Sequence, residues 1–188
     1  MQEQLFDGMD AMAANPQVRI IVVTGAGRAF CAGADMKGLD QISSVREGPP
    51  TTKNGFGMAS PTPKIRSITH AMTIPKPVIA AINGPVAGMG LAFALTCDFR
   101  FAANDAKITC AFSKLGLIAE HGMSWTLPKL VGTGTAMQLL MSSDVILGVE
   151  AQRLGMVQRC FDKAGVLDET VKYARDLAAT YYILHTTT

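Results

Sequence analysis

The sequence predicts an α/β fold with a largely parallel sheet. Two segments, residues 18–24 (VRIIVVT) and 77–82 (PVIAAI), are almost entirely apolar and rich in branched side chains. Strands that are buried on both faces of a parallel sheet have this character. A glycine-rich turn follows each segment, and helical patterns alternate with further short strands along the chain. A repeated order of strand and helix is typical of α/β architecture.

Local periodicity predicts the individual elements. Leu5, Met9 and Met12 lie at i, i+4 and i+7, which predicts an N-terminal helix that ends before Pro16. Residues 39–67 are polar and rich in proline, so we expect a loop or a weak helix there. Further strands are expected at 98–102, 106–110 and 156–161, and further helices at 91–96, 125–131, 135–141 and 168–179.

The composition and charge of the chain exclude several classes of function. The 188 residues are 48% hydrophobic and 17% charged, which predicts one globular domain with a real core. The net charge of +2 and the lack of any Lys/Arg run argue against nucleic-acid binding. No uncharged apolar stretch approaches the roughly 18 residues of a membrane span.

The four cysteines form no C-x-x-C pair, so neither a metal site nor a redox motif is expected. Reduced thiols are usual in the cytosol. The first nine residues carry polar side chains where a signal peptide needs an apolar run. We therefore expect a cytoplasmic location.

Two glycine-rich turns are the candidate site. Residues 31–35 (CAGAD) and 84–90 (GPVAGMG) each follow a predicted buried strand, and the second opens a helix. Small residues let the backbone approach a ligand, and free N–H groups at a helix start stabilise negative charge. Two such N–H groups that converge on one point form an oxyanion hole, although either turn alone is also an ordinary connection between strand and helix.

Nucleotide binding is not supported by these glycines. Residues 25–30 (GAGRAF) carry Phe30 where the dinucleotide fingerprint requires its third glycine. The Gly-Lys-Ser/Thr ending of a P-loop is also missing.

Several motifs in order resemble the crotonase (enoyl-CoA hydratase/isomerase) family over roughly residues 5–178. Residues 28–35 (RAFCAGAD) resemble its first oxyanion segment, and residues 76–98 (KPVIAAING, then GMG and CD) resemble its second. The spacing to three later segments also fits: 115–118 (LGLI), 127–132 (LPKLVG) and 151–157 (AQRLGMV). The resemblance implies a crotonase-like (ClpP/crotonase) spiral core of ββα turns, an acyl-CoA substrate and a homotrimer or dimer of trimers. It implies no cofactor beyond the coenzyme A of the substrate.

The resemblance also implies roles for individual residues. The oxyanion donors would be the backbone N–H groups of Ala34 and Met89, and Met89 stands where many relatives have glycine. The residues implied in substrate binding are Ala32, Asp35 and Met36 of the first turn and Gly88 and Gly90 of the second.

Both glutamates that hydratases of the family use to activate water are absent. Their positions carry Ala92 and Phe112. A different acid, Glu120, stands where several relatives, including peroxisomal-type Δ3,Δ2-enoyl-CoA isomerases, carry the glutamate that moves a proton between carbons 2 and 4. Its neighbours in sequence are apolar, so we expect a buried carboxylate suited to proton transfer, although an acid that merely precedes a helix is an alternative.

We expect structural roles for His121 and Trp125, which lie near Glu120 in the sequence. His121 could orient Glu120 or act as a second acid or base. Because consecutive residues need not point the same way, we favour a structural or surface role for it. Trp125 is expected in the core.

The leading hypothesis is an enzyme that isomerises Δ3-enoyl-CoA to Δ2-enoyl-CoA through Glu120. Hydratase-like activity or isomerisation of a ring acyl-CoA is an alternative within the family. A further alternative is a non-catalytic acyl-CoA binder or oligomer partner. We expect the family's first strands and C-terminal helical region to be shortened here, with a crotonase-like domain at 1–180 and an atypical tail at 181–188.

Overall fold

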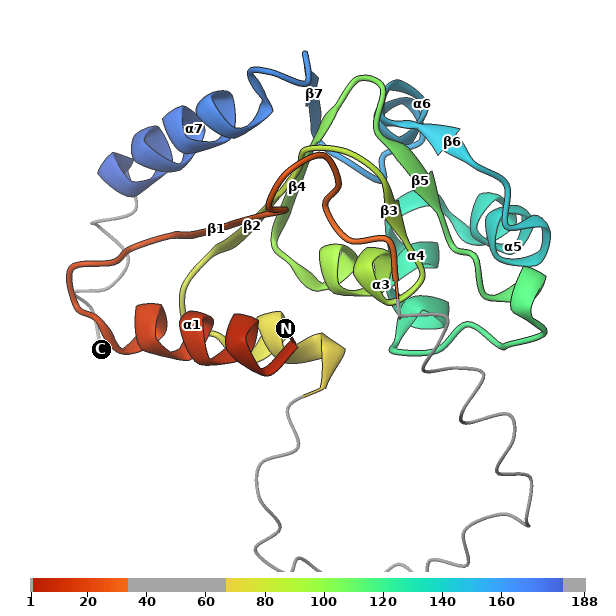
Figure 1. Ribbon diagram of the computed structural model, residues 1–188, viewed down its shortest axis with the longest axis horizontal. Helices are drawn as coiled ribbons and strands as arrows, with labels where there is room; N and C mark the ends of the chain where they lie inside the picture. Colours follow the sequence, from red (N-terminus) through yellow and green to blue (C-terminus); the bar gives the residue numbers. More distant parts are fainter. Residues whose placement is uncertain (1, 34–66, 181–188) are drawn as a thin grey trace, which may run out of the picture.

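Two small sheets organise the molecule in the computed structural model, which describes residues 2–33 and 67–180 (Figure 1). The first sheet is parallel throughout, and the second joins one parallel and one antiparallel pair. The first has the order β1 (Ile21–Thr24), β2 (Val78–Ile82), β4 (Phe99–Ala103), β7 (Arg159–Phe161). The second has the order β3 (Val86–Ala87), β5 (Lys107–Thr109), β6 (Ile146–Leu147). The largely parallel sheet expected from the sequence is confirmed.

The chain alternates between the two sheets. β2 of the first sheet leads directly to β3 of the second and then to helix α3 (Met89–Thr96). β4 and β5 repeat the step, and Cys31 forms an isolated parallel bridge to Val86 after β1. Each of these three repeats, which begin with β1, β2 and β4, thus contributes a strand to the first sheet and a strand or bridge to the second. This arrangement is the expected ββα spiral.

Strand β2 lies at the centre and is buried along its whole length. Val78, Ala80 and Ile82 join the main core, whereas Ile79 packs in a second cluster with Phe101. This alternation follows from the period of two in a strand. Helices α1 (Gln2–Ala14) and α7 (Val166–Thr180) therefore lie on opposite faces of β1 and β2 (Figure 1).

The remaining elements complete the second half of the chain. They are η2 (Ser113–Leu115), α4 (Met123–Val131), α5 (Thr133–Ser142) and α6 (Gly148–Arg153). β1 is shorter than residues 18–24, because its ladder begins where Ile21 N–H donates to Pro77 O at 2.9 Å and Pro77 has no N–H to return. The expected loop at 39–67, apart from Ser67, and the tail at 181–188 lie outside the described residues. None of the helices described combines the length and hydropathy that a membrane crossing requires.

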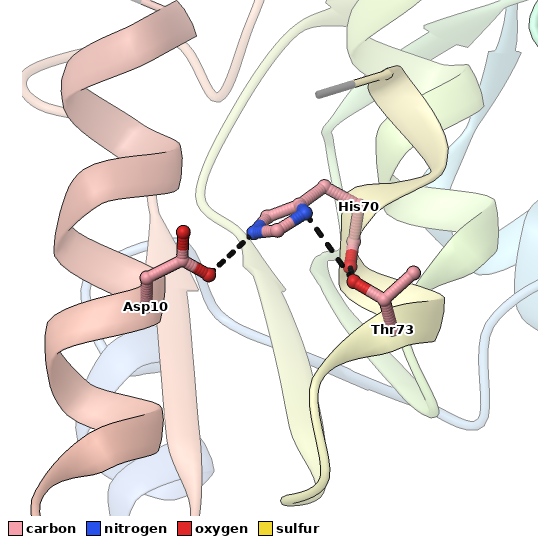
Figure 2. Close-up of polar contacts among 3 residues, drawn as sticks. All are labelled: Asp10, His70 and Thr73. Atoms are coloured by element: carbon pink, nitrogen blue, oxygen red, sulfur yellow. Dashed lines mark hydrogen bonds and ion pairs between the residues drawn. The ribbon is translucent and has the colours of Figure 1, made fainter. Parts of the chain in front are cut away.

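Helix α1 is tied to the short 3-10 helix η1 (Ile68–Thr73) by a polar cluster (Figure 2). The Nε2 of His70 lies 2.8 Å from Asp10 Oδ1, and its Nδ1 lies 3.3 Å from the Thr73 hydroxyl. The His70 ring also packs on Phe6, with 4.9 Å between ring centroids. Lys76 donates to the carbonyls of residues 12 and 15 at the end of α1, at 3.1 and 2.6 Å. These contacts fix α1 as one wall of the candidate site.

Candidate active site

The two glycine-rich turns are interlocked through their backbones. Phe30 and Cys31 N–H groups donate to Pro85 O at 3.1 and 3.3 Å, and Ala87 N–H donates to Cys31 O at 2.9 Å. A Cβ on Gly84 would lie only 2.2 Å from Arg28 O. Only a glycine permits this approach, so the sequence pattern follows from the packing of one turn against the other.

The second turn presents a backbone donor. Gly88, with φ 51°, turns the chain into α3, and its own N–H donates to Thr109 O at 3.3 Å. Met89 is the first residue of α3, and no described residue accepts a hydrogen bond from its N–H. A free N–H at a helix start is suited to an oxyanion, as the sequence predicts for this residue.

The first turn is described as far as Gly33. Gly33 has φ 99°, a left-handed conformation, and a Cβ there would lie 3.4 Å from Ala87 O. The predicted donor Ala34 and the predicted substrate contacts Asp35 and Met36 lie outside the described residues. Their roles remain predictions.

Two cavities meet at these turns. The smaller, of about 290 Å³, is lined by Ala32, Gly88, Glu120 and neighbouring residues. The larger, of about 510 Å³, lies against α1, is mostly apolar and is lined by Gly90 among others. Gly33 and Met89 line both cavities. The predicted donor Met89 thus stands at the border between two spaces that could hold the two arms of a thioester.

Glu120 lies in the smaller cavity, which places it with the second turn as the sequence predicts. Its burial was predicted wrongly, because the side chain is 44% exposed. Met123 packs inward at 0%, but Ile118 lies outside at 79% and cannot shield the carboxylate. Apolar neighbours in sequence do not bury a residue when the backbone turns them outward.

The two hydratase positions carry no acid near the cavity. Phe112 lines the smaller cavity and is 6% exposed, whereas Ala92 is fully buried within α3. Lys114 and Ala111 also line this cavity and were not foreseen. Lys114 belongs to the 3-10 turn η2, which has no sequence period long enough to reveal its orientation.

The prediction for Trp125 is also wrong. The sequence places it in the core, but the side chain is 55% exposed and Lys129 Nζ lies 3.5 Å from its ring centroid. The amphipathic helix α4 turns Met123 and Leu127 inward, so Trp125 falls on the outer face.

A ββα spiral that brings two glycine-rich turns together at a cavity is characteristic of the crotonase fold. The family model described as Enoyl-CoA hydratase/isomerase matches residues 1–187, and the chain belongs to this family.

The names of similar proteins include both isomerases and hydratases. The chain is 35% identical to 1,2-epoxyphenylacetyl-CoA isomerase of Escherichia coli (strain K12), over 95% of this chain and 66% of that protein. It is 36% identical to crotonyl-CoA hydratase of Syntrophomonas wolfei subsp. wolfei, over 91% of this chain and 62% of that protein. It therefore spans about two thirds of the length of these relatives.

Solved structures of the family agree in fold. A probable enoyl-CoA hydratase/isomerase from Mycobacterium abscessus superposes with a TM-score of 0.77 at 30% identity, covering 94% of this chain and 63% of the other. A monofunctional enoyl CoA isomerase from M. smegmatis gives a TM-score of 0.69 at 29% identity, covering 93% and 69%.

Proposed function

We propose that this chain is an enzyme that moves the double bond of a Δ3-enoyl-CoA to the Δ2 position, with Glu120 as the base. The observation that carries the proposal is the pairing of Glu120 and Met89 in one cavity, whereas the two hydratase positions hold Phe112 and Ala92. A single carboxylate is sufficient for an isomerisation, because the proton removed is the proton returned.

The proposed reaction has two steps. Glu120 takes a proton from carbon 2, and the electron pair moves into the thioester to form a dienolate. The N–H groups of Ala34 and Met89 stabilise its oxygen, and each donor typically contributes about 3 kcal/mol. The carboxylic acid then returns the proton to carbon 4, which leaves the double bond between carbons 2 and 3. The acyl arm lies in the cavity with Glu120, and the pantetheine arm lies in the larger cavity against α1.

The carboxylate is tested by Glu120→Gln, which keeps the shape and removes the base. We expect the variant to lose isomerisation of 3-hexenoyl-CoA by at least about 100-fold while its Kd for acyl-CoA changes little. Glu150→Gln is the matched control, because Glu150 is paired with Arg153 on α6 away from the cavity. Unchanged turnover in Glu120→Gln would refute the mechanism.

Two alternatives have different substrates or outcomes. The name of the E. coli relative supports isomerisation of a ring acyl-CoA, and that of the S. wolfei relative supports hydration. Parallel assays of 3-enoyl-CoA and 2-enoyl-CoA separate isomerisation from hydration. Tight acyl-CoA binding with no turnover of either would instead support a non-catalytic binder.

We further propose that the chain acts as a homotrimer or a dimer of trimers. Large apolar side chains on α5 and at β6 support self-association, because Met137, Met141 and Leu147 are 54%, 71% and 44% exposed. Sedimentation velocity with Met141→Glu tests this proposal. A wild-type chain that sediments as a monomer at micromolar concentration would contradict it.

A further inference from the structure

His121 follows the proposed base directly and has an unusual backbone. Its φ is 55°, in the left-handed region, and Gly122 follows with φ 77°. Few residues other than glycine adopt this conformation, although histidine does so more often than most. The turn is closed by Met123 N–H, which donates to Glu120 O at 3.0 Å as α4 begins. Strain of this kind persists where the surrounding structure holds it, often at functional sites.

The left-handed turn changes where the two side chains point. In an extended chain, consecutive side chains lie on opposite faces. Here Glu120 and His121 both line the smaller cavity, together with Met89. In this turn the two consecutive side chains therefore face the same cavity, and His121 can act on Glu120.

The two side chains are also close to each other. His121 Nε2 lies 3.7 Å from Glu120 Oε2, and the two side chains are 31% and 44% exposed. The imidazole ring packs on the buried Phe112, with 6.3 Å between ring centroids and an interplanar angle of 45°. Catalytic hydrogen bonds are often long in a free enzyme and shorten when substrate binds. Phe112 supports the ring from the position at which hydratases place a glutamate.

We propose that His121 is a positioning residue for Glu120. When substrate binds, its Nε2–H donates to Oε2, which leaves Oε1 to take the proton from carbon 2 and return it to carbon 4. His121 neither gains nor loses a proton in this cycle. The inference rests on the proposed function of Glu120 as the base.

The test begins with His121→Gly. Glycine adopts φ 55° without strain, so this variant removes the imidazole and leaves the turn intact. We expect no fall in melting temperature, a loss in kcat of about 10- to 100-fold, and a KM within about twofold of wild type. We expect His121→Gln, whose amide can donate to Oε2, to recover part of kcat.

A double variant separates positioning from an independent role. Because His121 acts through Glu120, the variant Glu120→Gln/His121→Gly should be no slower than Glu120→Gln alone. A purely structural His121 would instead lower the melting temperature or change KM and kcat together. Wild-type kcat in His121→Gly, or no recovery in His121→Gln, would overturn the role of His121.

Proton removal can be measured apart from isomerisation. In D2O, deuterium uptake at carbon 2 of a saturated acyl-CoA reports on the base alone. If Glu120→Gln is inactive and His121→Gly is fully active, the inference fails and the role of Glu120 stands. If isomerisation is absent but exchange is lost in Glu120→Gln and slowed in His121→Gly, the isomerase proposal fails and the positioning role stands. Full exchange in Glu120→Gln overturns both.

Discussion

The side chain of Asn83 holds the backbone of Gly25 at two points. Gly25 N–H donates to Asn83 Oδ1 at 3.1 Å, and Asn83 Nδ2 donates to Gly25 O at 3.0 Å. The same Nδ2 lies 2.9 Å from Gly27 O. One amide at the end of β2 thus fixes the turn at the end of β1. This contact ties the chain that leads into the first glycine-rich turn to the end of β2.

Replacing Asn83 by Ala should loosen the turn at Gly25–Gly27, which follows β1. Loss of a partly buried amide clamp costs about 1–3 kcal/mol, and the backbone groups of Gly25 lose their partners. We expect lower stability in urea and a larger loss of kcat than of acyl-CoA affinity. Asn104→Ala is the control, because the Asn104 amide donates to Asp162 Oδ1 at 3.0 Å and so joins the ends of β4 and β7 rather than those of β1 and β2. Equal kcat in Asn83→Ala and Asn104→Ala would contradict the clamp.

Gly90→Ala should disrupt the contact between the turns. An added Cβ would lie 2.5 Å from Cys31 O and 2.6 Å from Cys31 Cβ, so α3 must move away. Overpacking of this kind costs about 1–3 kcal/mol. Gly8→Ala in helix α1 is the matched control, because nothing lies within 4 Å of its added Cβ and alanine favours a helix by about 1 kcal/mol. Thermal unfolding should shift in opposite directions for the two variants.

Met89→Gly should widen the range of acyl groups accepted. The substitution keeps the N–H donor but removes the side chain that lines both cavities. We expect the ratio of kcat/KM for a branched over a linear enoyl-CoA to rise about 10-fold. Met89→Leu, which nearly conserves volume, should leave the ratio near that of wild type. An unchanged ratio in Met89→Gly would show that the side chain does not bound the acyl group.

The buried thiols of Cys97 and Cys110 should resist alkylation, and the fold should lose stability at high pH, where unfolding allows these thiols to ionise. Burial raises the pKa of Cys97 from 9.0 to about 12 and that of Cys110 from 9.0 to about 11. At pH 8, iodoacetamide should therefore label the half-buried Cys31 before Cys97 or Cys110, as peptide mass spectrometry would report. Faster labelling of Cys97 would contradict its burial.

The sign of the pH effect follows from the same pKa values. The folded chain holds these two protons more tightly than the unfolded chain, so their contribution to stability is complete below about pH 9. It is lost as the pH rises toward 12. Urea unfolding between pH 8 and 11 should show this fall, and Cys97→Ala should reduce it.

Local sequence predicted the centre of the fold well. β2 is apolar at every position and α3 follows a glycine turn, so both elements could be predicted. β3 and β6 have only two residues each, which is too short for any periodicity to show.

The predicted burial of Glu120 and Trp125 and the predicted structural role of His121 depended on where the backbone directs each side chain. The exposure of Glu120 and Trp125 and the inward turn of His121 follow from the left-handed backbone at 121 and from the orientation of α4. The outward position of Trp125 could have been predicted from the apolar spacing of Met123 and Leu127, whereas no local pattern indicates the left-handed turn at His121.

The central place of β2 also implies an order of folding. Val78 on β2 and Asp98, next to β4, are 20 positions apart, whereas Thr24 and Ala81 on β1 and β2 are 57 positions apart. Closing the longer loop costs about 1 kcal/mol more in chain entropy. β2, α3 and β4 should therefore form a nucleus early, with the Met89 donor already in place. The turn after β1 should dock later and, in native-state hydrogen exchange, open first.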